Sequence, residues 1–302
     1  MSLKVLITGG AGFIGTHLLK RLIAENKYKI FVVDNLSAVA KTRFPRQVKF
    51  YRSAIQDPSL GKIFQQVKPQ IVFHLAADNR IISSASETIS SNVIGTFNIL
   101  HQAKLAKVKQ VIFTSSAAVY GESKKFPIQE NFPTKPISAY GLSKLTGELY
   151  CQLFQKHFPV TIFRFANVYG PGQNSSSEGG VVAIFIRKFL ENKTPIIYDT
   201  GKQIRDFIYV DDVVDALILA LEKPQSTTLN IGSSQPTSIL KLLKLTAKLI
   251  GRPVNYISKP KRPVEIGKSL FSHELAVKKL NWHPKTDLAD GLEQTIKYFK
   301  SL

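Results

Sequence analysis

The sequence predicts an α/β protein with a doubly wound parallel sheet and a smaller, partly interleaved C-terminal α/β lobe. Three observations support this fold class. The chain opens with a short apolar strand at residues 3–7, a glycine-rich turn and an amphipathic helix. A second strand follows at residues 29–33. Strands and helices then alternate to residue 166, which is typical of parallel strands joined by right-handed crossovers.

The opening turn carries glycines at positions 9, 12 and 15. Glycines at a strand-to-helix turn allow a tight reversal and a close backbone approach to a pyrophosphate, which the helix N-terminus then binds. Asp34 ends the second strand, at about the 20-residue distance where a carboxylate binds an adenosine ribose. The alternative is a tight turn without a ligand. The carboxylate favours a Rossmann-type dinucleotide site, and it favours NAD because it would repel a 2′-phosphate.

The remaining elements of the first sheet follow in order. Strands are predicted at residues 48–52, 70–75, 110–115 and 160–165, and helices at 58–67, 87–106 and 138–157. Ligands bind at the carboxyl ends of such strands. We therefore expect functional residues at positions 74–77, 115–116 and 166–167.

A glycine- and serine-rich loop at residues 170–180 ends the regular alternation of strands and helices. Beyond it we expect a helix at 181–192, a strand at 196–198, a helix at 238–250, a strand at 254–258 and two final helices. Residues 207–221 and 228–231 are predicted to return to the first sheet as helix plus strand. Residues 1–166 with about 201–232 should thus form a nucleotide domain, and about 167–200 with 233–302 a substrate lobe.

The bulk properties limit the partners. The formal net charge is +20, but no long basic run or basic–aromatic repeat predicts nucleic-acid binding. A lysine-rich solvated surface is the simplest interpretation, and a doubly anionic nucleotide substrate would also suit a positive field. The single cysteine, Cys151, excludes an internal disulfide and fits a reducing compartment. With no signal peptide or spanning segment predicted, we expect a cytoplasmic protein that binds no membrane.

Tyr140 and Lys144 form the pair that points to chemistry. On the helix predicted at 138–157, positions i and i+4 share one face. A phenol with a pKa of about 10 is a poor base at neutral pH, but a nearby cation favours the phenolate. Ser115 and Ser116 end the preceding strand, where they could bind a substrate hydroxyl. An ordinary surface Tyr–Lys pair is the alternative.

Several ordered motifs reveal a resemblance to a known family. They lie at residues 8–15, 74–77, 92–96, 115–121, 140–144 and 164–171. Together they resemble the extended short-chain dehydrogenase/reductases, and most closely the nucleotide-sugar 4-epimerases of the UDP-glucose 4-epimerase type. The resemblance implies that Tyr140 is the general base, that Lys144 tunes it and binds the nicotinamide ribose, and that Ser116 orients the sugar 4-hydroxyl.

The resemblance also implies binding residues for cofactor and substrate. NAD would contact Gly9, Gly12, Phe13, Ile14, Gly15, Asp34, Asn35, Ile55, Leu75, Ala76, Ala77, Asn92, Tyr140, Lys144 and Phe165. The UDP-sugar would contact Ser116, Tyr140, Asn167, Val181, Arg205, Arg262, Glu265 and Ser269. The two arginines would bind the diphosphate and Glu265 the ribose. No metal is expected, and the helices at 87–106 and 138–157 would form a homodimer interface.

Departures from the family pattern refine the expectation. Ala54 replaces an aspartate that contacts adenine, and the loop at 78–86 lacks the usual Val-x-x-Ser pattern. Ala118 stands where dehydratases and decarboxylases of the superfamily carry an acid, which argues against those activities. Ser269 stands where glucose-only epimerases tend to carry a bulky tyrosine, so an N-acetyl group should fit.

We therefore expect an NAD-dependent 4-epimerase of a UDP-hexose that works through a transient 4-keto intermediate. UDP-glucose and UDP-galactose are the expected substrates, with the N-acetylhexosamine pair as an extension. One alternative is an NAD(P)H-dependent reductase of a nucleotide 4-keto-sugar, which would use the same Tyr140, Lys144 and Ser116. A second alternative is a non-catalytic nucleotide-binding member of the family.

Overall fold

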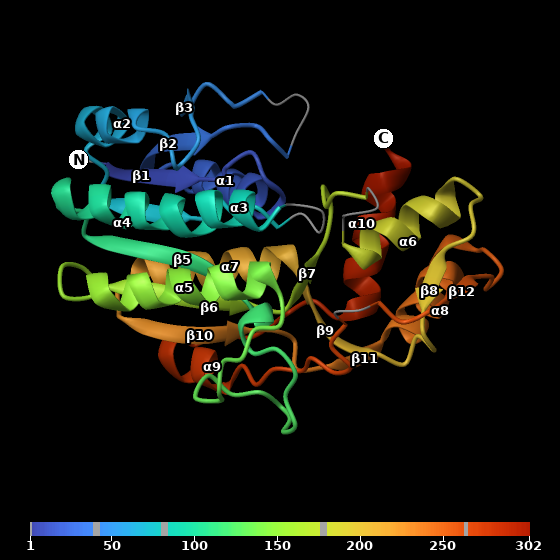
Figure 1. The fold of residues 1–302 in the computed structure, drawn as a ribbon. Coiled ribbons are helices and arrows are strands. Elements are labelled where there is room, and N and C mark those ends of the chain that lie inside the picture. Colours follow the sequence, from blue (N-terminus) through green and yellow to red (C-terminus); the bar gives the residue numbers. More distant parts are fainter. Residues whose placement is uncertain (1, 39–42, 80–83, 176–179, 263–264) are drawn as a thin grey trace.

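The computed structural model describes residues 2–38, 43–79, 84–175, 180–262 and 265–302 (Figure 1). Within these ranges, seven parallel strands form one sheet in the order β10-β6-β5-β4-β1-β2-β3. The strands are β1 (Leu3–Thr8), β2 (Tyr28–Asp34), β3 (Val48–Arg52), β4 (Ile71–His74), β5 (Gln110–Ser116), β6 (Val160–Phe165) and β10 (Thr227–Ile231). The strand order reverses between β1 and β4, where a crevice opens at the carboxyl ends of a doubly wound sheet. The predicted fold class is confirmed.

Helices cover both faces of this sheet (Figure 1). On one face lie α1 (Phe13–Glu25) and α7 (Val210–Glu222), and on the other lie α2 (Ser59–Val67), α4 (Gly95–Leu105) and α5 (Ala139–Phe154). Successive strand residues point to opposite faces. Val5 and Ile7 of β1 accordingly pack in the core with α1, whereas Leu6 packs in the core with α2 and α4.

The helix predicted at residues 87–106 is interrupted. It begins as α3 (Ala85–Thr88), capped by Ser84 and Glu87, widens into a π-helical turn over Ile89–Ile94, and continues as α4. Such turns are rare and tend to occur at functional sites. Here the turn carries Asn92, whose side chain is buried against the loop that follows β4.

The smaller lobe is built on short strands and three longer helices. β7 (Asn167–Tyr169), β9 (Ile204–Tyr209) and β11 (Pro236–Ser238) form one sheet, and β8 (Ile196–Tyr198) pairs with β12 (Ile257–Lys259). Helices α6 (Val181–Leu190), α8 (Ile239–Ile250) and α10 (Leu288–Lys300) enclose a core that includes Tyr169, Phe185 and Phe207. Helix α9 (Glu274–Leu280) instead packs beside β10.

The prediction of a helix at 207–221 is wrong at its start, because residues 207–209 complete β9 and the helix begins at Val210. The reason lies in Asp206, which is fully buried. Its carboxylate accepts hydrogen bonds from the backbone N–H groups of Ser233, Ser234 and Phe271. These bonds hold the segment in the small sheet, a long-range constraint that local periodicity cannot reveal. No helix among the described residues is long and apolar enough to cross a membrane.

Candidate active site

The glycine turn leaves no room for side chains. Gly9 has a φ of +72°, and a Cβ there would lie 2.6 Å from the backbone nitrogen of Ala76. A Cβ on Gly15 would lie 2.3 Å from the carbonyl oxygen of Gly9. Gly12 precedes α1 and provides no side-chain cap for its first N–H groups. The turn therefore presents bare backbone and a helix N-terminus, the arrangement that binds phosphate groups.

Asp34 stands beside this turn and braces it. One carboxylate oxygen accepts a hydrogen bond from the N–H of Ala11 at 2.9 Å, and the other from the N–H of Leu36 at 2.8 Å. Asn35 next to it caps the N–H of Ser37. A carboxylate has about four lone-pair positions, so acceptor sites remain for the hydroxyls of a ribose.

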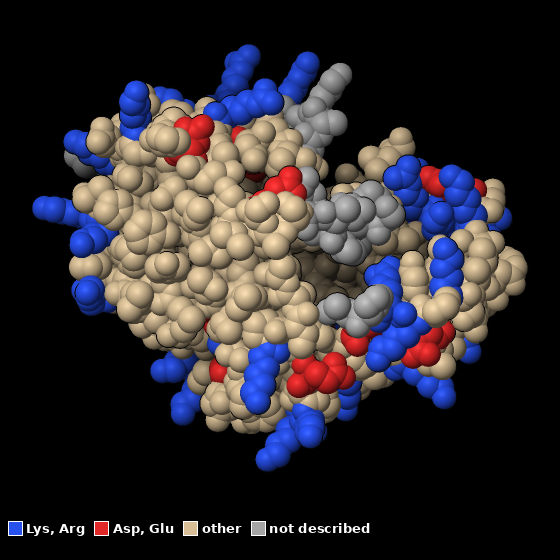
Figure 2. Space-filling model, viewed as in Figure 1, with Lys and Arg blue, Asp and Glu red and all other residues tan. Residues whose placement is uncertain are grey.

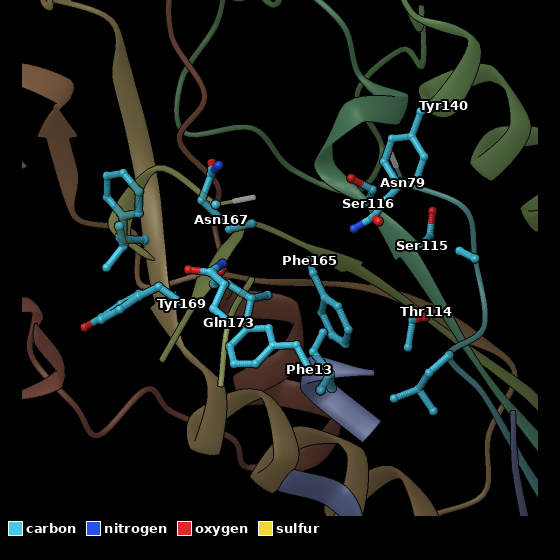
Figure 3. Close-up of a pocket in the computed structure, with 18 of the residues that line it drawn as sticks. Phe13, Asn79, Thr114, Ser115, Ser116, Tyr140, Phe165, Asn167, Tyr169 and Gln173 are labelled. Carbon is cyan, nitrogen blue, oxygen red and sulfur yellow. The ribbon is translucent and has the colours of Figure 1, made fainter. Parts of the chain in front are cut away.

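A cavity opens between the two lobes, below the carboxyl ends of the main strands (Figure 3). It brings together residues from distant parts of the chain, as the sequence predicts. The predicted site residues that line it are Phe13, Ile14, Leu75, Ala77, Ser116, Tyr140, Lys144, Phe165, Asn167 and Val181.

Lys144 is buried beside Tyr140 on α5. Its Nζ donates a hydrogen bond to the carbonyl oxygen of Thr114 at 2.7 Å and lies 6.0 Å from the centre of the Tyr140 ring. Burial lowers the pKa of Lys144 to about 8, although Glu148 opposes the change. Burial also raises the pKa of Tyr140, and a hydrogen bond with Ser116 opposes that rise. The pKa of Tyr140 is therefore raised, opposite to the expected lowering, and the group that opposes the rise is Ser116 and not Lys144.

A buried ion pair lies beneath these groups. The Nε and one terminal nitrogen of Arg164 on β6 donate to the carboxylate of Glu148 on α5 at 3.0 and 2.6 Å. Burial disfavours the charged guanidinium, but Glu148 outweighs it and holds the pKa of Arg164 above its usual value. Ser115 donates its hydroxyl proton to the same carboxylate. Both serines line the cavity, but the Ser115 proton is committed to Glu148, so Ser116 is the serine that can still donate to a substrate hydroxyl.

A second cavity continues from the first and shares Ser116, Phe165 and Asn167 with it. The other predicted substrate residues line this part, namely Arg205, Arg262, Glu265 and Ser269, and Ala118 lines it as well. Arg205 lies 3.7 Å from Glu265, and the guanidinium of Arg262 stacks 3.9 Å from the centre of the Tyr198 ring. Paired guanidinium groups suit a diphosphate because they offer bidentate hydrogen bonds.

Eight predicted cofactor residues do not line either cavity. Five of them belong to the glycine turn and its neighbourhood described above, namely Gly9, Gly12, Gly15, Asp34 and Asn35. The other three are Ile55, Ala76 and Asn92. Ile55 is 4% exposed and belongs to the core. Ala76 packs against Gly9. The amide of Asn92 is used by protein groups, since it binds both backbone polar groups of Asp78 and the hydroxyl of Ser143. Contacts of these residues with a cofactor stay predictions.

Several cavity residues were missed by the sequence analysis, and two of them carry side-chain amides. Asn79 and Gln173 both line the first cavity (Figure 3). Asn79 follows the carboxyl end of β4, a position that could have suggested it. Gln173 lies in a glycine-rich loop, where the sequence indicates a turn and nothing more.

Comparison with known families decides the class of this site. Residues 5–232 match the NAD dependent epimerase/dehydratase family. The chain belongs to this family. It is an NAD-dependent epimerase, as its relatives in that family also indicate.

The relatives extend over the whole length of this epimerase. The UDP-glucose 4-epimerase of Mycolicibacterium smegmatis is 32% identical over 311 residues, which cover 99% of each chain. The crystal structure of the Thermotoga maritima UDP-glucose 4-epimerase with UDP-glucose has a TM-score of 0.96 and 38% identity, again over 99% of each chain. The Thermus thermophilus UDP-glucose 4-epimerase in complex with NAD has a TM-score of 0.93 and 30% identity over 99% of each chain.

The glycine turn of this epimerase fits its cofactor. At Gly9 and Gly15 any Cβ would clash with neighbouring backbone, so the turn is bare and a pyrophosphate can approach its backbone closely. Asp34 retains acceptor positions for the hydroxyls of a ribose. Residues 53–55 lack the expected acid, since Ala54 stands there. The adenine end of the site thus has one polar side chain fewer than the family pattern.

The buried ion pair of this epimerase can be tested by mutation. Replacing Glu148 with leucine should destabilise the fold by about 3–5 kcal/mol, because it leaves the Arg164 charge buried without a partner. Adding Arg164→Met should restore most of the loss. Urea unfolding would measure both, with the exposed pair Arg187–Glu191 as control, where Glu191→Gln should change little. A double variant as unstable as the single one would contradict this explanation.

Proposed function

We propose that this epimerase inverts carbon 4 of a UDP-hexose through a transient 4-keto intermediate. The observation that supports the proposal is the continuity of the two cavities. One end holds Tyr140, Ser116 and Lys144, and the other holds Arg205 and Arg262. A nucleotide diphosphate bound to the arginines would extend its sugar toward the tyrosine.

The proton chemistry belongs to Tyr140. As a phenolate it takes the proton of the sugar 4-hydroxyl while a hydride leaves carbon 4, so the alcohol becomes a ketone. When bound, NAD supplies the acceptor and later donor of that hydride, and a positive charge that favours the phenolate. Lys144 adds its own charge, and Ser116 orients the hydroxyl. The inversion would be completed when the hydride returns to the opposite face of carbon 4 and Tyr140 returns the proton to the 4-oxygen.

The arginines act at a distance from the reacting carbon. Binding energy spent on the diphosphate retains the ketose while its ring turns over, without opposing that rotation. Glu265 Oε2 is buried and has no hydrogen-bond partner among the described residues, so an acceptor remains for a ribose hydroxyl. Asn167 and Val181 would contact the sugar.

The two lobes would divide this work. We assign NAD to residues 1–166 with about 201–232, through the glycine turn, Asp34, Asn35, Leu75, Ala77 and Phe165. The substrate lobe would comprise about 167–200 and 233–302. Strand β9 lies where the two lobes meet. Its residues belong to the range 201–232 that we assign to the NAD lobe, but the strand pairs with β7 and β11 of the small sheet.

Two small residues in the second cavity bear on the substrate. Ser269 is 8% exposed and lines that cavity, so a larger substituent on the sugar has room there. UDP-N-acetylglucosamine is therefore a proposed substrate beside UDP-glucose. Ala118 provides no acid for the elimination that a dehydratase performs.

The decisive experiment is an inversion assay without added cofactor. Incubation with UDP-glucose or UDP-N-acetylglucosamine should produce the 4-epimer, because the cofactor is regenerated in each cycle and stays bound. Product analysis by NMR or coupled assay measures it. NADPH oxidation with a nucleotide 4-keto-sugar, and no inversion, would favour the reductase. Absence of both would favour a non-catalytic protein.

Tyr140→Phe tests the general base. Turnover should fall by about 10²–10⁴-fold, because the variant lacks the group that accepts the proton. The content of bound NAD should not change. Tyr150→Phe on the same helix is the matched control and should keep full turnover. Equal turnover in Tyr140→Phe and wild type would refute the assignment.

We also propose that the protein is a homodimer through α4 and α5. Phe97 and Leu105 on α4 and Leu142, Leu149 and Leu153 on α5 are all exposed. Figure 2 shows that the face over these helices carries almost no charge, although the rest of this view is studded with lysine and arginine. An uncharged apolar face of this kind fits a second copy of itself.

Charge substitution tests the dimer. The double variant Leu149→Glu with Leu153→Glu should be monomeric in light scattering after size exclusion, because it places buried like charges across the two-fold axis. Ile257→Glu, an exposed apolar site on β12, is the control and should leave the mass unchanged. A monomeric wild type, or a double variant that still dimerises, would exclude this interface.

A further inference from the structure

Asn79 lines the catalytic cavity with an unused side chain. It shares that cavity with Ser116 and Tyr140 (Figure 3). The residue is exposed, and its carboxamide makes no hydrogen bond with any residue that the structure describes. A carboxamide offers both donors and an acceptor. A group of this kind in a reaction cavity is available to a ligand.

The backbone that carries Asn79 is held firmly. The N–H of Asp78 donates to Oδ1 of Asn92 at 2.7 Å, and Nδ2 of Asn92 donates to the carbonyl of Asp78 at 2.8 Å. The same Nδ2 also donates to Ser143 Oγ at 3.0 Å, and Ser143 donates to the carbonyl of Tyr140 at 2.8 Å. Asn92 is 2% exposed. These bonds tie the chain just before Asn79 to the helical turn that carries Tyr140.

Three other polar side chains of the cavity already donate hydrogen bonds within the protein. Ser115 donates to Glu148, Lys144 donates to Thr114, and the Gln173 amide donates to the carbonyl of Val168 at 2.7 Å. Asn79 therefore differs from these neighbours, because it faces the same space with its full hydrogen-bonding capacity.

We propose that the Asn79 carboxamide binds a hydroxyl of the hexose beside the reacting one, at carbon 3 or carbon 6. The inference rests on the proposed function, in which Tyr140 and Ser116 hold the 4-hydroxyl. Asn79 lines the same cavity, so a neighbouring hydroxyl falls within its reach. A carboxamide can donate a hydrogen bond to a hydroxyl or accept one from it. Asn79 can therefore bind the hydroxyl both before and after the ring turns over.

The first test compares variants with intact substrate. Asn79→Ala should lower kcat/KM for UDP-glucose by roughly 3- to 10-fold, the effect of one neutral hydrogen bond. Asn79→Leu should lower it at least as much, because its side chain also excludes a replacing water. Ser86→Ala lies in the segment that follows, outside the cavity, and is the matched control with unchanged kcat/KM. Bound NAD should stay constant in all three variants.

The second test identifies the hydroxyl. UDP-3-deoxyglucose and UDP-6-deoxyglucose are compared with UDP-glucose in wild type and Asn79→Ala. When the hydroxyl that Asn79 binds is removed from the sugar, kcat/KM of the wild type should fall by about the same factor as the Asn79→Ala mutation causes. The kcat/KM of Asn79→Ala should then hardly change, because its hydrogen bond is already lost. For the other hydroxyl, the two proteins should lose equal factors.

The outcomes separate this inference from the proposed function. If the wild type inverts UDP-glucose but Asn79→Ala keeps full kcat/KM, the inference about Asn79 is wrong and the function stands. Equal losses in both proteins for both deoxy sugars would overturn it too. Loss of NAD from Asn79→Ala would mean that the amide serves the cofactor. A wild type that inverts no UDP-hexose would instead remove the proposed function.

Discussion

The ion pair between Arg164 and Glu148 is the constraint on which the site depends. It connects β6 to α5, and Ser115 attaches β5 to the same carboxylate. Arg164 also donates to the hydroxyl of Tyr120 at 2.9 Å, and Tyr120 donates to Asn230 on β10 at 2.7 Å. Desolvating two charges is costly unless their hydrogen bonds are satisfied. Here they are satisfied by Ser115 on β5, by the Tyr120 hydroxyl and by the carbonyl of Glu130, and Tyr120 extends the network to β10. The network therefore holds the ends of β5, β6 and β10 in one relative position.

The main sheet and most of the site could be predicted because their signals are local. The glycine turn, Asp34 and the Tyr140–Lys144 spacing each depend on a few consecutive residues or one helical period. Alternation of strands and helices then brings the strand ends to one edge. Tyr140, Ser116 and Lys144 accordingly line one cavity, as expected from the sequence.

The features that could not be predicted are set by contacts across the chain. Residues 207–209 are strand because Asp206 is held by Ser233, Ser234 and Phe271. Ser115 and Ser116 look alike in sequence and both line the cavity, yet only Ser115 donates its hydroxyl proton to Glu148. The π-helical turn at Ile89–Ile94 has no local signature that distinguishes it from an ordinary helix.

The position of β10 at the edge of the main sheet has a consequence for biosynthesis. This strand pairs with β6, and much of the small lobe, including α6, β8 and β9, lies between them in the chain. A ribosome must therefore release part of the second lobe before the first sheet can be finished. Pairings between distant segments form slowly because the intervening chain must first be closed into a loop. The nascent chain exposes the edge of β6 during that interval, and an unpaired strand edge can pair with other chains.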